Sequence, residues 1–300
     1  MSFALEENEE LSISVKRIAV EQIDLALYHL RNAGEDLDNS VHATRQSLKR
    51  LRSLVALVSP ELGKRTFKRE WTCYRSAGRL LASGRDAAVV VQTFDAVISR
   101  FSSELTPEAF AAERCFLIER RDARLKEMVE EGALVKASEL LLSARERVAT
   151  WRVKCRGFKA LRRGTRCSYR SSRQDLRSVL RHRTATNFHQ WRHPVKLLWH
   201  QLQILTPIWP VILNAHSAEL GALSDRLNEN HDLDVLSDAK LWSDFESQEQ
   251  GPEPLISLIA RRCRELEAEA LILGERLFTE RPRRFADRIE RYFQAWQHGY

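Results

Sequence analysis

A repeated arrangement of basic residues constrains this chain more than any other feature. The pattern His-x-x-Arg-x-x-x-Lys occurs twice, at residues 42–49 and 189–196. Each copy is followed a little over 40 residues later by a second shared element, RDAAVV from Arg85 and HDLDVL from His231. Two markers in the same order at nearly the same separation indicate an internal duplication.

Each copy of the pattern places its basic side chains on one side of a helix, because positions i, i+3 and i+7 share a face. A stripe of this kind suits a polyanionic ligand. A neutral histidine donates from one ring nitrogen, and a protonated one donates from both and adds charge. The two stripes consist of His42, Arg45 and Lys49, and of His189, Arg192 and Lys196.

The composition favours helices over sheets. Of the 300 residues, 43% are hydrophobic and 30% charged, whereas only 11 are glycine and 8 proline, and we find no sustained strand alternation. We therefore predict an all-α fold. Pro194 lies inside the second motif helix and predicts a kink near 190–194. The expected helices cover about 13–32, 40–58, 60–82, 85–101, two stretches within 106–150, 151–182, 186–205, 211–230, 232–247, 253–278 and 282–297.

Positive charge is concentrated in one segment. Residues 145–183 hold fourteen Lys or Arg residues and only two acids, Glu146 and Asp175. That segment carries +12, which leaves −5 for the remainder of a chain whose net charge is +7. Most of these residues are arginines, which bind phosphate or carboxylate oxygens through a planar fork. We predict that residues 151–182 form a helix facing a charged groove or cavity.

The cysteines, the N-terminal segment and the lengths of apolar runs indicate where the protein resides in the cell. The five cysteines show no Cys-x-x-Cys spacing, which predicts reduced thiols packed as small hydrophobic groups. Residues 1–11 are acidic, lack the apolar core of a secretory signal and are expected to be a disordered leader. No apolar run approaches the length of a membrane span. The sequence predicts a cytoplasmic protein without membrane association.

Five sequence blocks, taken together, resemble a known family. VHATRQSLKRLRSLVALV, YRSAGRLLASGRDAAVV, LRRGTRCSYRSSRQDL, TNFHQWRHPVKLLWHQLQIL and NENHDLDVL follow one another in the order of the signature blocks of CHAD domains, the conserved-histidine α-helical domains. The resemblance covers residues 12–297. It implies two four-helix-bundle-like halves, about 12–150 and 151–297, related by a pseudo-two-fold axis around a central basic pore or groove.

The resemblance also implies a function. CHAD domains bind inorganic polyphosphate and associate with polyphosphate granules, and some are fused to a CYTH-type triphosphate tunnel domain. This chain is expected to be a stand-alone member, because too little sequence precedes its first helix and no Glu-x-Glu-x-Lys start is present. The ligand-binding residues that the family pattern implies are His42, Arg45, Lys49, Arg50, Arg52, Arg75, Arg79, Arg85, Arg162, Arg166, Arg170, His189, Arg192 and Lys196.

The second half departs from the family pattern. His193 and Pro194 stand where basic residues are usual, Trp199 stands at the position that Arg52 occupies in the first half, and His231 replaces the arginine of the Arg-Asp element. The second half should therefore hold its ligand less strongly. Asp86, Asp232 and Asp234 are expected to anchor neighbouring Arg or His side chains or to cap helices.

Other functions receive less support from the sequence. HQWRH mimics a zinc-protease spacing, but Gln190 replaces the catalytic glutamate and no third ligand is evident, so neither metal nor cofactor is expected. No carboxylate cluster accompanies the basic stripes to hold Mg²⁺ for phosphoanhydride cleavage. Non-specific RNA or DNA binding through the Arg-rich helix 151–182 remains the alternative, although aromatic residues are not interleaved with the basic ones.

Overall fold

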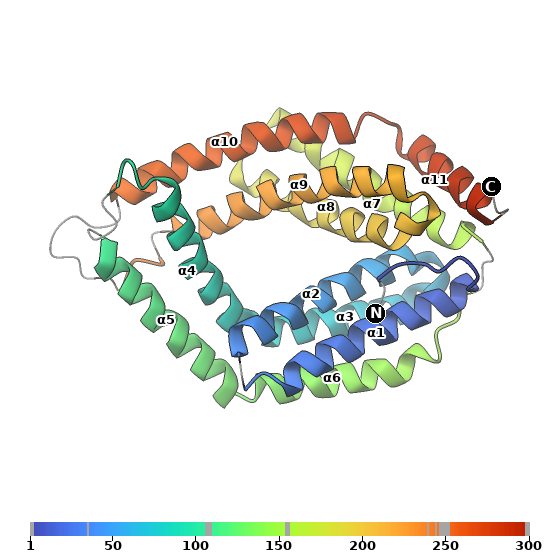
Figure 1. Ribbon diagram of the computed structural model, residues 1–300, viewed down its shortest axis with the longest axis horizontal. Coiled ribbons are helices and arrows are strands. Elements are labelled where there is room, and N and C mark those ends of the chain that lie inside the picture. The colour runs from blue at the N-terminus through green and yellow to red at the C-terminus, as the bar shows by residue number, and fades with distance from the viewer. Residues whose placement is uncertain are drawn as a thin grey trace.

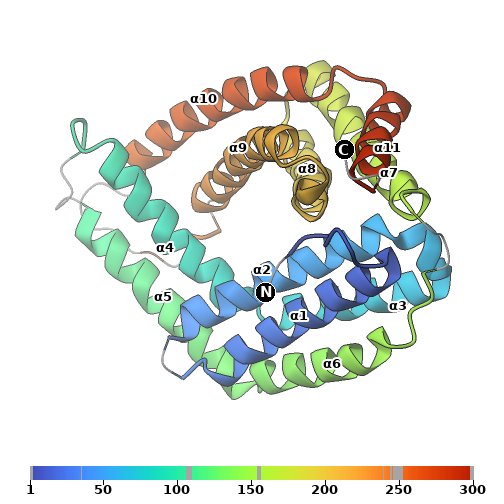
Figure 2. The same ribbon diagram turned by 45° about the vertical axis from the view of Figure 1, so that its right-hand side comes forward.

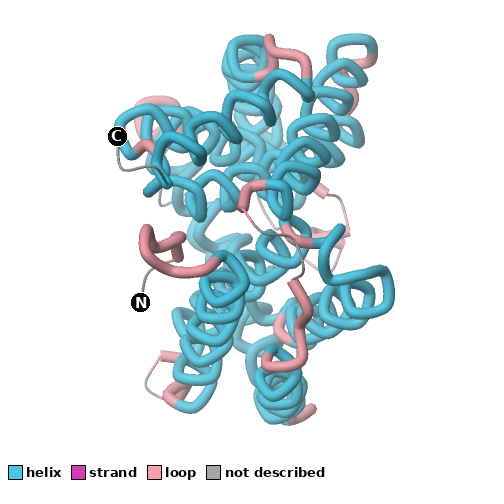
Figure 3. The backbone as a smooth tube through the Cα atoms, turned by 90° about the vertical axis from the view of Figure 1, so that its right-hand side faces the viewer, coloured by secondary structure: helices cyan, strands magenta, loops and turns pink. Residues whose placement is uncertain are grey.

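The computed structural model describes residues 3–34, 36–105, 110–153, 157–238, 240–243, 245 and 253–297. Across these residues the chain is helical and contains no strand, which confirms the all-α prediction (Figure 3). In chain order the elements are α1 (Leu11–Arg31), α2 (Leu37–Leu57), α3 (Ser59–Leu80), α4 (Ala82–Arg100), α5 (Ala111–Glu130), α6 (Ala133–Val148), α7 (Lys159–Arg181), α8 (Ala185–Leu205), the short 3₁₀-helix η2 (Thr206–Ile208), α9 (Pro210–Leu236), α10 (Glu253–Leu277) and α11 (Pro282–Gln297).

The helices pack in two groups that meet at the two motif helices. In the first group α2 contacts α1 and α3, and α6 closes the bundle by contacting the same two helices (Figure 1). In the second group α8 packs between α7 and α9, and α10 lies along α9. Figure 2 shows α8 and α9 near the middle of the molecule, with α10, the α4–α5 pair and the first group around them. The direct contact between α2 and α8 joins the groups.

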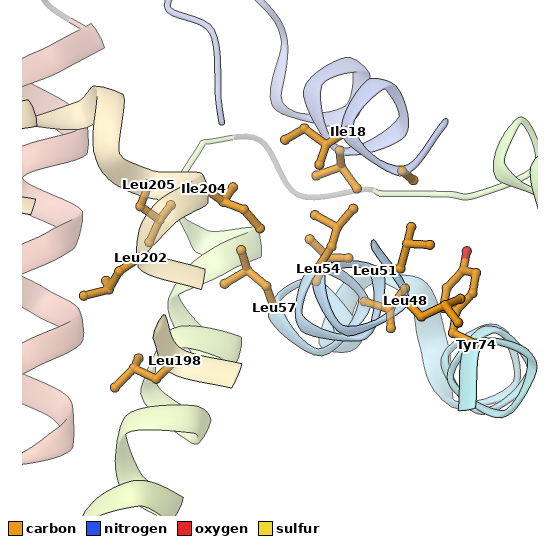
Figure 4. Packing of buried hydrophobic residues seen from close by; sticks show 14 of the residues in the cluster. Ile18, Leu48, Leu51, Leu54, Leu57, Tyr74, Leu198, Leu202, Ile204 and Leu205 are labelled. Carbon is orange, nitrogen blue, oxygen red and sulfur yellow. The ribbon is translucent and has the colours of Figure 1, made fainter. Parts of the chain in front are cut away.

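Two separate hydrophobic cores support this arrangement. The larger core contains residues of α1, α2, α3, α6, α7, α8, α11 and the first part of α9. Figure 4 shows Leu57 of α2 on the side where Leu198 and Ile204 of α8 lie. The smaller core joins α4 and the start of α5 to α10 and the end of α9, through residues such as Phe94 and Ile259. Each core therefore draws on both sequence halves.

The acidic leader is not free along residues 3–10, contrary to the expected disorder. The Leu5 side chain is 3% exposed, and its backbone N–H donates to the Ile204 carbonyl oxygen at 3.0 Å. The Arg17 guanidinium donates to the Glu9 carboxylate at 3.0 Å. The leader's acids thus neutralise a neighbouring arginine, while Leu5 and the partly buried Phe3 add to the core. Residues 1 and 2 lie outside the described part of the chain.

Several predicted helix boundaries were wrong. The first motif helix is capped by Asp36, whose side chain accepts from the Asn39 N–H, and Ser40 lies inside the helix. The break after α3 falls at Leu81 and not at Gly84. Gly84 instead lets α4 approach α5, because a Cβ there would lie 2.7 Å from Leu125 Cδ2.

One expected interruption in the second half is also absent. The predicted break near residue 231 does not occur, since α9 continues to Leu236. The second motif helix α8 is continuous through Pro194, which is buried on the core side of the helix, and the kink expected near 190–194 stays a prediction. The expected division of residues 106–150 into two helical stretches is confirmed: α5 and α6 are separated at Gly132, whose backbone is left-handed with φ of 67°.

The Arg-rich helix α7 is amphipathic, although its sequence contains few large apolar residues that would indicate a buried face. Its buried face is completed by small side chains, among them Gly164, Thr165 and Ser168. These residues allow very close packing: a Cβ on Gly164 would lie 1.9 Å from the backbone oxygen of Leu57 at the end of α2. Lys154, Cys155 and Arg156, which the prediction placed in this helix, lie outside the described residues.

Replacing Gly164 by alanine should therefore destabilise the fold. The new methyl group would meet backbone rather than a movable side chain, so α7 must shift away from α2 at a cost of about 1–3 kcal/mol. Thermal or urea unfolding measures the loss. Gly34→Ala is the matched control, because a Cβ there meets nothing within 4 Å. Equal stability of the two variants would contradict the close α2–α7 contact.

Candidate functional site

Basic side chains of both motif helices line one hollow region between α2, α3, α4, α8 and α9. Three cavities of about 260, 240 and 490 Å³ adjoin there, and all three share Arg45 and Lys49. We call this region the basic groove. Ten of the predicted site residues line it: His42, Arg45, Lys49, Arg52, Arg75, Arg79, Arg85, His189, Arg192 and Lys196.

Four predicted residues are not brought into these cavities. Arg50 lies over the ring of Phe3 in the leader, with 5.3 Å between its Cζ and the ring centroid. Arg162 pairs with Asp287 and Glu290 of α11 and has a structural role. Arg166 and Arg170 of α7 are not among the residues that line these three cavities, and Arg170 is exposed. The buried face of α7 includes small residues such as Gly164 and Ser168.

Short polar contacts hold the first-half arginines in place. Arg45 donates from Nη1 to the Gly78 carbonyl oxygen of α3 at 2.8 Å, and its Nη2 lies 3.2 Å from Asp86 Oδ1 of α4. Arg85 donates to Asp38 Oδ1 at 3.2 Å. Asp86 thus anchors an arginine, as predicted. Each contact engages only part of a guanidinium, and the remaining N–H groups stay available to a ligand.

An unpredicted residue, Asn228 of α9, holds the second-half cations together. Its Oδ1 accepts from Arg192 Nε at 2.6 Å and from Lys196 Nζ at 3.0 Å. A neutral oxygen between two cations occupies the kind of position that a phosphate oxygen would fill. The sequence signal was present in NENHDLDVL, but only the charged residues of that block attract attention.

The two groove lysines lie in an unfavourable environment for their own charge. Burial, reinforced by neighbouring cations such as Arg45 and Arg192, lowers the pKa of Lys49 to about 8 and that of Lys196 to about 7. Burial likewise raises the pKa of Asp232 above its usual range. In the described part of the chain, no carboxylate lies within salt-bridge distance of either ammonium group. An anion entering the groove would relieve this strain.

The departures from the family pattern also lie in the groove. His189 and His231 approach with 3.0 Å between their Nδ1 atoms, and burial lowers the pKa of His231 to about 4. His193 Nε2 lies 3.0 Å from Arg52 Nη2 and accepts its hydrogen bond. Burial also lowers the pKa of His42 and His193. At neutral pH the imidazoles of His42, His193 and His231 therefore act as polar groups and contribute little charge.

The Trp191 and Trp199 side chains do not serve the groove directly. Trp191 is fully buried and fills space that a Cβ on Gly274 would occupy, 2.5 Å from its Cη2. Trp199 stacks on His200 and lies over Gly221. Both indoles therefore pack within or between helices, as large aromatic side chains usually do.

Asn228→Asp should uncouple stability from ligand binding. A carboxylate at this position would neutralise Arg192 and Lys196 internally, which raises the melting temperature but makes the aspartate compete with an incoming anion. We expect binding of an anionic ligand to weaken about tenfold, corresponding to about 1.4 kcal/mol. Thermal melting and ligand titration on the same preparations check both effects. Parallel loss of stability and binding would contradict this role of Asn228.

Two negative findings apply to the described residues. They contain no group of three or more His, Cys, Asp or Glu side chains arranged to hold a metal ion. None of the helices assigned there combines the length and apolarity needed to cross a membrane. HQWRH on α8 instead contributes His189 and His193 to the walls of the basic groove.

Comparison with known proteins identifies the fold family. The CHAD domain family matches residues 17–241, a span that includes α2, α8 and every groove residue named above. The chain belongs to the CHAD domain family. The matched segment covers three quarters of the chain, and the helices α10 and α11 follow it.

A solved structure shares the fold of this CHAD domain. PptA from Streptomyces chartreusis superposes with a TM-score of 0.55 at 14% sequence identity, over 96% of this chain and 100% of that one. At this level of identity the likeness concerns the fold alone. No curated protein matches the sequence.

Proposed function

We propose that this CHAD domain is a non-enzymatic binding protein for inorganic polyphosphate. The observation that carries the proposal is the convergence of ten basic residues from both motif copies on cavities that share Arg45 and Lys49. Polyphosphate is a flexible chain with about one negative charge per phosphate, so its binding needs many donors in a row rather than one catalytic constellation. Arginine forks and lysine point charges meet that need.

We further propose that the two halves are pseudo-symmetric and form one basic pore. In support, α2 and α8 carry the repeated pattern and contact one another. Lys49 of the first copy lowers the pKa of Lys196 in the second, and Arg192 of the second copy lowers that of Lys49. The second elements of the repeat, Arg85 on α4 and His231 on α9, face the same cavity. In a cell, such a pore would place the protein on cytoplasmic polyphosphate granules.

Titration with long-chain polyphosphate and with tRNA, each across a salt series, tests the proposal. Burial of Lys49 and Lys196 reduces screening by salt, so we expect polyphosphate binding to persist at salt concentrations that abolish tRNA binding. Equal affinities that fall together would instead indicate non-specific binding to the exposed arginines of α7. Release of phosphate with added divalent metal would contradict the non-enzymatic assignment.

A further inference from the structure

The basic groove opens into a second cavity of different character. This cavity, which we call the side pocket, has a volume of about 690 Å³ and lies between α3, α7 and α8. It shares His189, His193 and Leu197 with a cavity of the basic groove. Its other lining residues include Phe67, Trp71, Cys167, Ser171, Asp175 and Gln190. Its volume and largely apolar lining are typical of a site for a small organic molecule.

One wall of the side pocket is aromatic. Phe67 and Trp71 pack with 5.6 Å between ring centroids, and His193 stacks on Trp71 at 6.0 Å with 13° between the rings. Arg52 lies over the same indole, with its Cζ 4.6 Å from the centroid. Since Arg52 and His193 also line the basic groove, the aromatic wall and the cationic surface meet at these two side chains. A molecule at the junction could touch both.

The α7 side of the side pocket carries an unpaired acid. Asp175 is half-buried on α7, where burial raises its pKa, and within the described residues it has no hydrogen bond or ion pair. Ser171 and Gln190 supply further polar groups in the same pocket. A carboxylate in this position repels phosphate but accepts hydrogen bonds from N–H donors. Polyphosphate alone therefore leaves Asp175 and the aromatic wall without a role.

We propose that the side pocket binds the base of a guanine nucleoside oligophosphate whose phosphates lie in the basic groove. The base would stack on the aromatic wall, and its N1–H and exocyclic amino group would donate two parallel hydrogen bonds to Asp175. Arg52 and His193 would contact the phosphates nearest the nucleoside. This inference rests on the proposed phosphate-binding role of the groove and adds a ligand class to it.

The proposal makes a prediction that simple electrostatics does not. Inorganic tripolyphosphate carries the same number of phosphates as GTP and more negative charge, so a basic surface alone would bind tripolyphosphate at least as tightly. A base subsite reverses that order. Stacking of one base contributes enough to strengthen GTP binding about tenfold relative to tripolyphosphate. Inosine triphosphate, which lacks the exocyclic amino group, should fall between the two.

The experiment is a calorimetric titration of the full chain with GTP, inosine triphosphate, tripolyphosphate and long-chain polyphosphate. Asp175→Asn should abolish the preference for GTP over inosine triphosphate. Ser171→Leu, which fills the exposed mouth of the pocket, should reduce the ratio of GTP to tripolyphosphate affinity to about one. Neither change should weaken binding of long-chain polyphosphate.

Three other results would overturn the proposal at different levels. If long-chain polyphosphate binds but GTP binds no better than tripolyphosphate, the side pocket is not a base subsite and the groove assignment stands. If no phosphate compound binds, including long-chain polyphosphate, the proposed function itself is wrong. A GTP preference that both variants retain would place the base elsewhere and reject the assigned pocket.

Discussion

Replacing Arg45 and Arg192 together by glutamine should weaken polyphosphate binding about 100-fold. One arginine comes from each copy of the repeat, and both line the basic groove. Each charge-assisted hydrogen bond to phosphate contributes about 1.5–3 kcal/mol, so the loss of two such bonds to one ligand chain weakens binding about 100-fold even at the lower value. Glutamine keeps a donor for the Gly78 carbonyl that Arg45 contacts, which protects the fold.

The α7 double variant Arg163→Gln with Arg170→Gln is the matched control. It removes the same charge from exposed positions that do not line the groove. We expect its affinity for polyphosphate to change by less than about threefold, since exposed charges are strongly screened. Circular dichroism of both variants would show retained helicity. Equal losses in the two variants would reject the groove and favour the α7 surface.

Polyphosphate binding should weaken steeply as pH rises above about 8. In the free protein the pKa of Lys196 is about 7 and that of Lys49 about 8, whereas a bound polyanion favours their charged forms and moves both values back toward 10.5. The complex then holds more protons than the free protein between these limits. For each proton taken up on binding, the affinity falls about tenfold for every unit by which the pH rises. Below about pH 7 both lysines are charged in the free protein, and they no longer make the affinity depend on pH.

The stability of the free protein should respond to pH in the opposite direction. The two lysines have lowered pKa values in the folded state, so the unfolded chain binds more protons than the folded one between about pH 7 and pH 10. The free energy of unfolding therefore rises with pH in this window.

Titrations of the protein with polyphosphate in buffers of different ionisation enthalpy measure directly the protons taken up on binding. Lys49→Arg with Lys196→Arg should remove the pH slope, because arginine stays charged throughout. A slope that persists in this variant would assign the protons to other groups.

The class of fold and the centre of the groove were predictable because both depend on periodicity. Spacing of i, i+3 and i+7 places His42, Arg45 and Lys49 on one side of α2, and the structure brings that side to the groove. The repeat predicted that α8 would contribute an equivalent set, and Arg192 and Lys196 line the same cavity. Local sequence patterns were sufficient here because all residues of each stripe belong to a single helix.

The orientation of α7 was not predictable from charge density. Fourteen basic residues between 145 and 183 suggested a helix directed into the groove, but the direction is decided by which face can pack most closely. Gly164 and its small neighbours allow contact with the α2 backbone at Leu57, which turns the arginines outward or toward α11. Small residues carry little hydrophobic signal, so their packing role appears only once the partner helix is known.

Asn228 escaped prediction for a related reason. Its role depends on lying between Arg192 and Lys196, which belong to another helix 32 and 36 positions away in the sequence. An asparagine among acids reads as a surface residue when α9 is considered alone. The pairing requires the relative placement of α8 and α9, which no pattern within either helix specifies.

Because the interior is divided into two cores, the basic groove is lined by side chains from helices of both. Arg45 and Lys196 belong to helices of the larger core, whereas Arg85 projects from α4, whose apolar side belongs to the smaller one. A phosphate chain lying across these side chains would add a bridge between the two cores to the one that α5, α9 and α10 already make, since these helices contribute residues to both. The protein with bound polyphosphate should therefore resist local opening between the two cores more strongly than the free protein, in which the positive charges of the groove repel one another.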